Sequence, residues 1–344
     1  MKKERLFYVD FVRTFAVFLI LLTHYNAHYL HYYILPERPE LAIITLNPFN
    51  ISTGALGVSL FFIISGAALM YVYKEKCDLK EFYTKRFLSL YPMFWIAYFT
   101  AFLYFFYKWK SVVHMDVPKG NFILTVLGMD GYLTGVLPSY YLLGEWFLGC
   151  IILMYMLFPL LRKVVLSNKW VVIIAVAAMY IPFALFEWFS NFKSSKILFV
   201  RLPELLFGML FVLNIKKVRP WMAFCSVAVL LGNSILKPGF PTSIQTTYVG
   251  ISCFLLLVYC SKWFDRGIIR AACHTVSKYS YAIFLTHHVI VDELALKFSM
   301  EELTRSGRYL LFILYVCLTG VAAWLLYHLH GRLVSWVRNA RNSG

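Results

Sequence analysis

The chain has 344 residues, of which 60% are hydrophobic and 19% aromatic, while only 15% are charged. This composition, together with long apolar runs, excludes a soluble globular domain and predicts a polytopic membrane protein. In a membrane protein, Lys and Arg residues are concentrated in the cytoplasmic loops, so we interpret the formal net charge of +16 through the topology of the chain. We expect no nucleic-acid partner.

The first apolar run, residues 7–24, predicts a membrane-spanning helix, which takes about 20 residues. It contains three ionisable residues, Asp10, Arg13 and His24. Arg13 and His24 lie close to three helical turns apart, so their side chains share one face, about 16 Å apart along the axis. Asp10 lies one turn before Arg13, within reach of a helical ion pair.

Charged residues within a membrane helix are costly and indicate a functional site by default. The alternative is that Arg13 extends to the cytoplasmic headgroups and that His24 lies in the opposite interface. That alternative accounts for each residue alone, but it does not require the two residues to share a face. We therefore treat Asp10, Arg13 and His24 as candidate site residues.

Further apolar runs predict nine more spans, so the expected fold is all-α, a polytopic transmembrane bundle of about ten helices. Residues 109–141 are interrupted by Pro and Gly, which predicts an external loop with a short or re-entrant piece at 121–133. Small residues in the second span allow close helix packing: Gly57, Ser65, Gly66, Ala67 and Ala68. The expected spans are residues 7–24, 54–73, 87–107, 142–161, 170–186, 200–213, 221–236, 246–260, 276–291 and 309–330.

The distribution of Lys and Arg predicts the topology. These residues are about twice as numerous in the segments expected to be cytoplasmic as in the external ones, which places both termini in the cytoplasm. Lys2, Lys3 and Arg5 precede the first span, and no small-residue cleavage site follows it, so we expect this span to be retained. We expect residues 1–344 to form a single membrane domain, without a soluble domain, in the plasma membrane of a bacterium.

Two patterns bear on metal binding and disulfides. The seven cysteines are scattered without a CxxC pair, which is typical of small buried residues and not of a disulfide framework or a zinc site. His24, His28 and His31 stand at i, i+4 and i+7, which is also a metal-ligand spacing on a helix. No acidic or cysteine ligand lies near them in the sequence, so we expect no metal.

Six groups of residues follow one another along the chain in an informative order. They are Asp10, Arg13 and His24; Phe62, Ser65 and Gly66; Lys85, Arg86, Tyr91 and Pro92; Trp146, Leu148 and Tyr155; Arg201, Pro203, Glu204 and Gly208; and Ser277, Ser280, Tyr281 and His287. In this order and at these spacings they resemble the membrane acyltransferase-3 family. Two positions depart from its pattern, because Ser89 stands where many relatives have a second Arg, and Ile151 where many have Glu. The carboxylate nearest to Ile151 is Glu145, directly before Trp146.

The resemblance implies transfer of an acyl group, expected to be acetyl, from cytoplasmic acyl-CoA to a hydroxyl of an extracytoplasmic or lipid-linked glycan. A histidine suits the general base of such a reaction, and Lys or Arg side chains suit the phosphates of CoA. The residues that the resemblance assigns are, for catalysis, His24, Arg13 and Asp10; for the acyl-CoA donor, Lys85, Arg86 and Arg201; and for the acceptor, Glu145, Trp146 and His287.

Other interpretations stay open at this point. A secondary transporter or flippase would line a polar pathway with the same charges, although the sequence shows no internal repeat. Glu145, Arg201 and Glu204 would pair with one another inside a bundle. His287 and His288 would be a packed pair at a helix end. The absence of a GxxxxGK loop excludes an ATP-driven pump for this chain alone.

Overall fold

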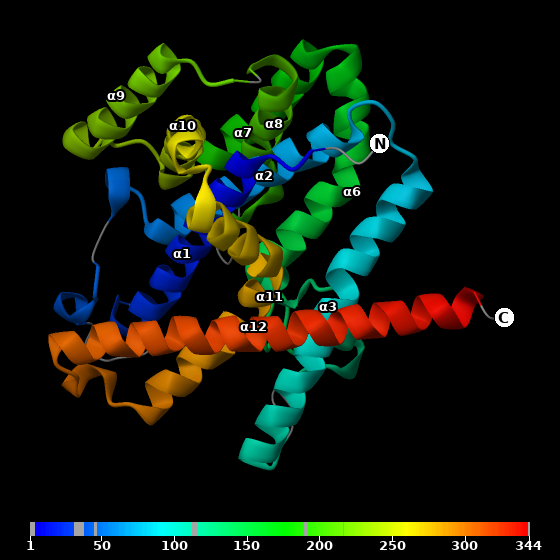
Figure 1. Ribbon diagram of the computed structural model, residues 1–344, viewed down its shortest axis with the longest axis vertical. Coiled ribbons are helices and arrows are strands. Elements are labelled where there is room, and N and C mark those ends of the chain that lie inside the picture. Colours follow the sequence, from blue (N-terminus) through cyan, green and yellow to red (C-terminus); the bar gives the residue numbers. More distant parts are fainter. Residues whose placement is uncertain are drawn as a thin grey trace. The chain divides into compact units, whose positions relative to one another are not determined.

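The computed structural model describes residues 4–30, 38–44, 47–111, 116–186, 188, 192–215 and 217–342. Lys2, Lys3, His31 and parts of the expected external loop lie outside these residues. Within the described residues the chain is helical and has no strand, so the all-α prediction is confirmed (Figure 1). The long helices are α1 (Phe7–Leu30), α2 (Thr53–Tyr73), α3 (Leu79–Trp109), α6 (Glu145–Ser167), α7 (Lys169–Leu185), α8 (Leu198–Leu210), α9 (Pro220–Leu236), α10 (Thr242–Phe264), α11 (Gly267–Lys297) and α12 (Arg305–Asn342).

Each of the ten expected spans falls on one of these long helices, but several helices extend further than predicted. α3 begins at Leu79 instead of residue 87, and α11 runs from Gly267 to Lys297 instead of 276–291. The reason is that an apolar run marks only the part of a helix suited to hydrocarbon. Backbone hydrogen bonding continues through polar residues until a breaking residue or a loop ends it.

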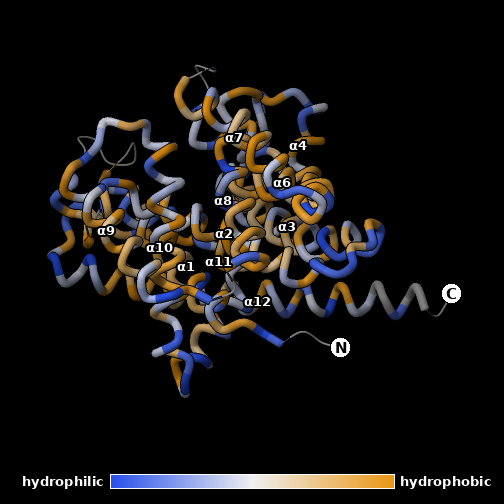
Figure 2. Tube along the Cα trace, turned by 90° about the horizontal axis from the view of Figure 1, so that it is seen from above, coloured by the Kyte–Doolittle hydropathy of each residue, from blue (hydrophilic) through white to orange (hydrophobic). Residues whose placement is uncertain are grey.

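Seven helices among the described residues are long and apolar enough to cross a membrane, and the chain is therefore a multi-pass membrane protein. They are α1, α2, α3, α6, α10, α12, and α8 together with the π-helical turn Phe211–Ile215 that extends it. α7 and α9 are apolar but have 17 residues each. Figure 2 shows that hydrophobic residues predominate along α2 and α7. The cytoplasmic location of the termini stays a prediction.

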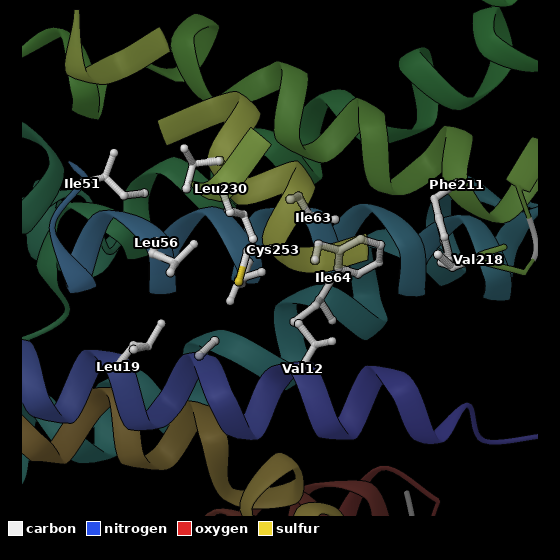
Figure 3. Close-up of a cluster of buried hydrophobic side chains, with 14 residues drawn as sticks. Val12, Leu19, Ile51, Leu56, Ile63, Ile64, Phe211, Val218, Leu230 and Cys253 are labelled. Carbon is white, nitrogen blue, oxygen red and sulfur yellow. The ribbon is translucent and has the colours of Figure 1, made fainter. Parts of the chain in front are cut away.

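The chain divides into two compact units that are interleaved in the sequence. The first unit comprises Met1–Leu22, Leu46–Leu79 and Cys150–Lys278. Within it α2 packs chiefly against α8, and α10 packs against both α9 and α2. Its core is apolar, and Figure 3 shows Val12 and Leu19 of α1 facing Leu56 and Ile64 of α2.

Two glycines explain the close packing of α2 on α8. A Cβ atom added to Gly66 of α2 would collide with the backbone of Leu205, and one added to Gly208 of α8 would collide with the backbone of Ile63. The two helix backbones therefore touch directly, as small residues permit in membrane proteins. This confirms the predicted role of the small residues in the second span for Gly66.

The second unit comprises Thr23–Thr45, Lys80–Gly149 and Tyr279–Gly344. It contains two short helices, α4 (Phe122–Val126) and α5 (Asp130–Leu133), where the sequence predicts a short or re-entrant piece. Tyrosines of α1 tie this unit together, because Tyr25 donates a hydrogen bond to the carbonyl of Arg308 and Tyr29 donates one to the carbonyl of Met300. Tyr25 also packs edge-to-face against Phe312 of α12. These contacts hold the end of α1 that carries His24.

Candidate active site

Four polar side chains of the second unit meet in one cluster: His24, Glu145, His287 and His288. The Nε2 atom of His24 lies 3.6 Å from Oε1 of Glu145, and Nε2 of His288 forms an ion pair with the same oxygen. The ring centroid of His24 lies 4.2 Å from that of His288 and 4.9 Å from that of His287. We refer to these four residues as the histidine–glutamate cluster. It joins His24 to Glu145 and His287, three residues that the sequence pointed to separately.

The cluster forms where three helices bring their polar residues together. His24 lies on α1, His287 and His288 lie on α11, and Glu145 is the first residue of α6. A carboxylate in the first turn of a helix interacts favourably with the backbone N–H groups at that end. Glu145 is held there by α5, because a Cβ atom added to Gly131 would lie only 2.8 Å from the Cα atom of Glu145. The short helix α5 thus packs directly against the backbone of the residue that supplies the carboxylate of the cluster.

Replacing Gly131 by alanine is expected to lower catalytic activity about tenfold or more. The added methyl group has no room beside the backbone of Glu145, so the carboxylate must shift, and small misplacements of a catalytic group are costly. The measurement is the rate of acyl transfer by the purified variant. Gly120→Ala is the matched control, since a Cβ atom there meets no heavy atom within 4 Å. Equal rates for both variants would show that α5 does not position Glu145.

Hydrogen bonding assigns the tautomer of His287. Its Nδ1 atom lies 2.8 Å from the carbonyl oxygen of Phe284 and 3.2 Å from that of Ile283. A carbonyl only accepts, so Nδ1 carries the proton and Nε2 holds the lone pair. His287 is fully buried, and its Nε2 has no hydrogen-bond partner among the described residues. The cluster therefore contains a buried lone pair that can accept a proton.

The position of Glu145 also bears on the tautomer of His24. A carboxylate beside Nε2 favours the form that carries its proton on Nε2, which leaves the lone pair on Nδ1. In that form Nδ1 is the atom that can accept a proton, and the carboxylate stabilises the positive charge that then develops on the ring. This arrangement can perform general base catalysis.

Sequence reasoning missed two residues near this site, His288 as a cluster member and Asp292. Asp292 lies one turn after His288 on α11, and its Oδ1 is 3.2 Å from Nε2 of His28, one turn after His24 on α1. The sequence does contain a signal for these residues. His24 and His28 are spaced i and i+4 on one predicted helix, and His288 and Asp292 have the same spacing on another, so each pair lies on one helix face. The pattern predicts two facing polar stripes, but the sequence does not show that the two helices are neighbours.

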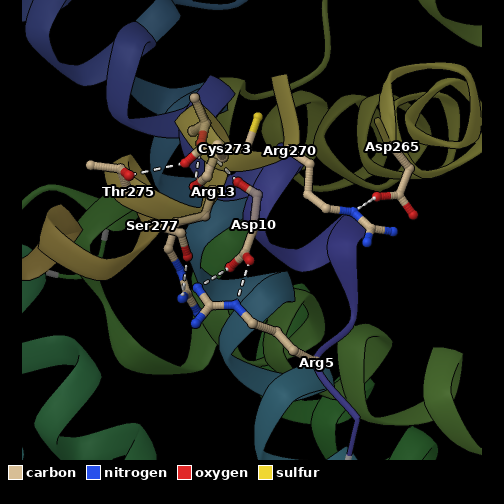
Figure 4. Close-up of polar contacts among 10 residues, drawn as sticks. Arg5, Asp10, Arg13, Asp265, Arg270, Cys273, Thr275 and Ser277 are labelled. Carbon is tan, nitrogen blue, oxygen red and sulfur yellow. Dashed lines mark hydrogen bonds and ion pairs between the residues drawn. The ribbon is translucent and has the colours of Figure 1, made fainter. Parts of the chain in front are cut away.

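The N-terminal end of α1 differs from the prediction (Figure 4). Both carboxylate oxygens of Asp10 pair with Arg5, at 2.5 Å from Nε and 2.8 Å from Nη2, whereas the ion pair with Arg13 that the helical spacing allows is not formed between these described residues. Arg5 precedes the helix, so its side chain can turn back and bind both oxygens at once. Arg13 instead donates a hydrogen bond of 2.9 Å to Oγ of Ser277 on α11.

Of the residues expected to bind the donor, Arg201 belongs to the first unit, and Lys85 and Arg86 belong to the second. Arg201 is 2% exposed and donates hydrogen bonds to Oε1 of Glu204 at 2.9 Å and to the carbonyl of Ser195 at 2.8 Å. Arg201 and Glu204 therefore pair with each other, as the alternative interpretation predicted, whereas Glu145 pairs with histidines. Lys85 is exposed and forms an ion pair with Glu81 one turn earlier.

Arg86 and Trp146, two other predicted site residues, directly follow Lys85 on α3 and Glu145 on α6. Arg86 is partly buried, with its guanidinium 6.0 Å from the centroid of the Phe82 ring. Trp146 follows Glu145 in the first turn of α6 and is partly buried.

The four residues of the histidine–glutamate cluster also have the composition of a metal site. One nitrogen or oxygen atom from each residue can be chosen so that all four atoms lie within 4.8 Å of one another. Imidazole and carboxylate groups are ligands of divalent transition metals. Sequence reasoning considered His24, His28 and His31 for this role, and the structure gathers a different set of ligands.

Comparison with known proteins identifies the family of the chain. A family model described as an acyltransferase domain, that of acyltransferase family 3, matches residues 6–328. No curated protein and no solved structure matches the chain. The match includes the histidine–glutamate cluster, Arg13, and the residues expected to bind the donor. The chain therefore belongs to the membrane acyltransferase-3 family and is a membrane acyltransferase.

Proposed function

We propose that the protein transfers an acyl group, expected to be acetyl, from cytoplasmic acyl-CoA to a hydroxyl of an extracytoplasmic or lipid-linked glycan. The observation that carries this proposal is the histidine–glutamate cluster in a chain of the acyltransferase-3 family. Such a transfer needs a base that removes the acceptor's proton, and the cluster offers imidazole lone pairs beside a carboxylate. A transporter has no comparable need for this arrangement.

In the proposed reaction His24 is the general base. Its Nδ1 takes the proton of the acceptor hydroxyl while the oxygen attacks the carbonyl carbon of the thioester. The new C–O bond forms, the C–S bond breaks, and the proton passes from His24 to the leaving thiolate, so that an ester and free CoA result. Glu145 holds His24 and stabilises the imidazolium, as a carboxylate does for other catalytic histidines.

The donor is proposed to bind through cations at the cytoplasmic side. Lys85 and Arg86 follow one another in the first turns of α3 and suit the phosphates of CoA. Arg13 lies on α1, the helix that carries His24, and is proposed to contact the donor. Arg201 is a weaker choice, because a phosphate would have to displace Glu204 from a buried ion pair.

We propose that the reaction needs no metal ion. A thioester is already activated toward attack by a hydroxyl, so a base and a positioned donor are sufficient. The carboxylate of Glu145 is paired with His288, and Nδ1 of His287 is bound to backbone carbonyls. These contacts account for the positions of the side chains without an ion.

Replacing Arg86 by alanine is expected to weaken the binding of acetyl-CoA by roughly tenfold, since one charge-assisted contact to phosphate is lost. Binding to the wild-type chain is also expected to weaken as salt rises, because exposed ion pairs are screened. The measurement is the dissociation constant of acetyl-CoA for purified protein in lipid nanodiscs. Lys80→Ala, an exposed residue of the same basic segment, is the control. Unchanged affinity in Arg86→Ala would remove this residue from the donor site.

The proposed function as a whole is tested by mass spectrometry of cell-surface glycans. Glycans are compared between cells that express the wild-type chain, cells that express His24→Gln, and cells that lack the gene. We expect an acetyl ester on a sugar in the first cells alone. Identical glycans in all three would contradict the assignment of a glycan acceptor.

A further inference from the structure

A cavity of about 530 Å³ lies within the second unit, next to the histidine–glutamate cluster. Its lining includes His28 of α1 and Asp292 of α11. His28 is one turn beyond His24, and Asp292 is one turn beyond His288, so each lies about 6 Å along its helix from a cluster residue. A ligand that contacts His28 or Asp292 therefore lies about one helical turn from a residue of the histidine–glutamate cluster.

The cavity has a fixed polar centre. The Nε2 atom of His28 lies 3.2 Å from Oδ1 of Asp292. The His28 side chain is only 5% exposed, whereas the Asp292 side chain is 41% exposed. His28 thus lies against Oδ1 of Asp292, while part of this carboxylate remains open to a ligand. A carboxylate held in this way accepts hydrogen bonds from hydroxyl groups with little loss of side-chain entropy.

The charge of the lining argues against an anionic ligand. Three carboxylates line the cavity: Asp292, Glu293 and Glu301. Lys108 compensates one of them, because its Nζ lies 2.7 Å from both oxygens of Glu293. Arg38, whose charge acts on Glu301, is itself paired with Glu40. The cavity therefore keeps a negative character, and a carboxylate or phosphate on the ligand would meet like charge.

One wall of the cavity is aromatic. The rings of Phe105 and Trp109 on α3 stack with centroids 4.7 Å apart and an angle of 14° between their planes. Two nearly parallel rings offer a firm apolar surface to a flat ligand. A sugar ring has C–H bonds on its faces and hydroxyls around its edge, so it fits an aromatic wall beside a carboxylate.

We propose that this cavity is the acceptor subsite and that it selects an uncharged sugar ring over a ring bearing a carboxylate or phosphate. The proposal rests on the proposed function and adds to it the place and the charge of the acceptor. The ring packs on Trp109, one hydroxyl donates to Asp292, and a neighbouring hydroxyl reaches toward the cluster. Asp292 is then a specificity-determining residue, and His28 is a positioning residue that acts through it.

The test measures binding, not turnover, so that its result is independent of the reaction. Saturation-transfer NMR is recorded on the full chain in nanodiscs with three probes: methyl α-D-glucopyranoside, methyl α-D-glucopyranosiduronate and methyl 2-amino-2-deoxy-α-D-glucopyranoside. We expect the neutral glycoside to bind and the uronate to bind at least about fivefold more weakly, because of like-charge repulsion. Asp292→Asn is expected to weaken binding of the neutral glycoside several-fold and to reduce the difference between it and the uronate.

The control variant is Glu302→Gln, which removes an exposed carboxylate next to Glu301 that does not line the cavity. It is expected to bind the three probes as the wild type does. The amino sugar, which carries a positive charge, is expected to bind at least as well as the neutral glycoside, because the cavity keeps a negative character. Stronger binding of the uronate than of the neutral glycoside, weaker binding of the amino sugar than of the uronate, no binding of any probe, or an unchanged profile in Asp292→Asn would each overturn the proposal. Acetyl-CoA turnover that depends on His24 is measured separately, so a failure of the proposed function is distinguishable from a failure of this subsite.

Discussion

His24→Gln is expected to lower the rate of acyl transfer by about 10² to 10⁴, the contribution of a positioned general base. Glutamine keeps a hydrogen-bonding group of similar reach, but it cannot take the proton of the acceptor hydroxyl. It is therefore expected to be as inactive as His24→Ala. The measurement is transfer of labelled acetyl from acetyl-CoA by purified protein, with the amount of folded protein checked by thermal unfolding.

Two comparisons make this result specific to the base. Binding of acetyl-CoA is expected to survive in His24→Gln, because the donor is proposed to be held by cations at the cytoplasmic side. His274→Gln, an exposed histidine on α11, is expected to retain full activity. If His24→Gln keeps most of the activity, His24 only positions the substrate. His287 is then the next candidate, because its buried Nε2 already holds a lone pair.

Much of the fold could be predicted from the sequence because hydrophobic runs and helix breakers are local signals. The ten apolar runs each correspond to a helix, and the Pro- and Gly-rich region contains two short helices. The limits of α11 could not be predicted from hydropathy, because the helix carries Arg270 and His274 before the predicted span and Asp292 and Glu293 after it. These residues lower the apolar character of a helix that nevertheless continues to Lys297.

The site was predicted less completely, for a different reason. His24 could be identified because an ionisable residue within an apolar run is recognisable from the sequence alone. The pairing of His24 with Glu145 could not be predicted, although Glu145 was expected to bind the acceptor. The two residues are far apart in the sequence, and their contact depends on how the start of α6, with α5 packed against it, lies beside α1. The Asp10–Arg13 pair failed for the opposite reason. Spacing on a helix allows such a pair, but Arg5 from outside the helix competes for the same carboxylate.

Glu145→Gln is expected to reduce the rate of acyl transfer by about 10² to 10³ while the affinity for acetyl-CoA stays unchanged. The amide is almost the same size as the carboxylate, but it cannot balance the charge that develops on His24 when the imidazole takes a proton. Glu145→Asp keeps the negative charge, but its side chain is one methylene group shorter, so the charge lies further from His24. We expect a rate between those of the wild type and Glu145→Gln. Glu75→Gln, which changes an exposed carboxylate on the surface, is the control.

The composition of the cluster is compatible with two roles for Glu145, a carboxylate that balances charge or a metal ligand. The same variants distinguish these two roles. The metal content of the purified protein is measured by mass spectrometry before and after treatment with a chelator. We expect less than one ion per chain and a rate that the chelator leaves unchanged. One tightly bound ion in the wild type that is lost in Glu145→Gln, with activity lost on chelation, would instead make Glu145 a metal ligand. In that case His24, Glu145, His287 and His288 would hold the ion, and a different group would accept the proton of the acceptor.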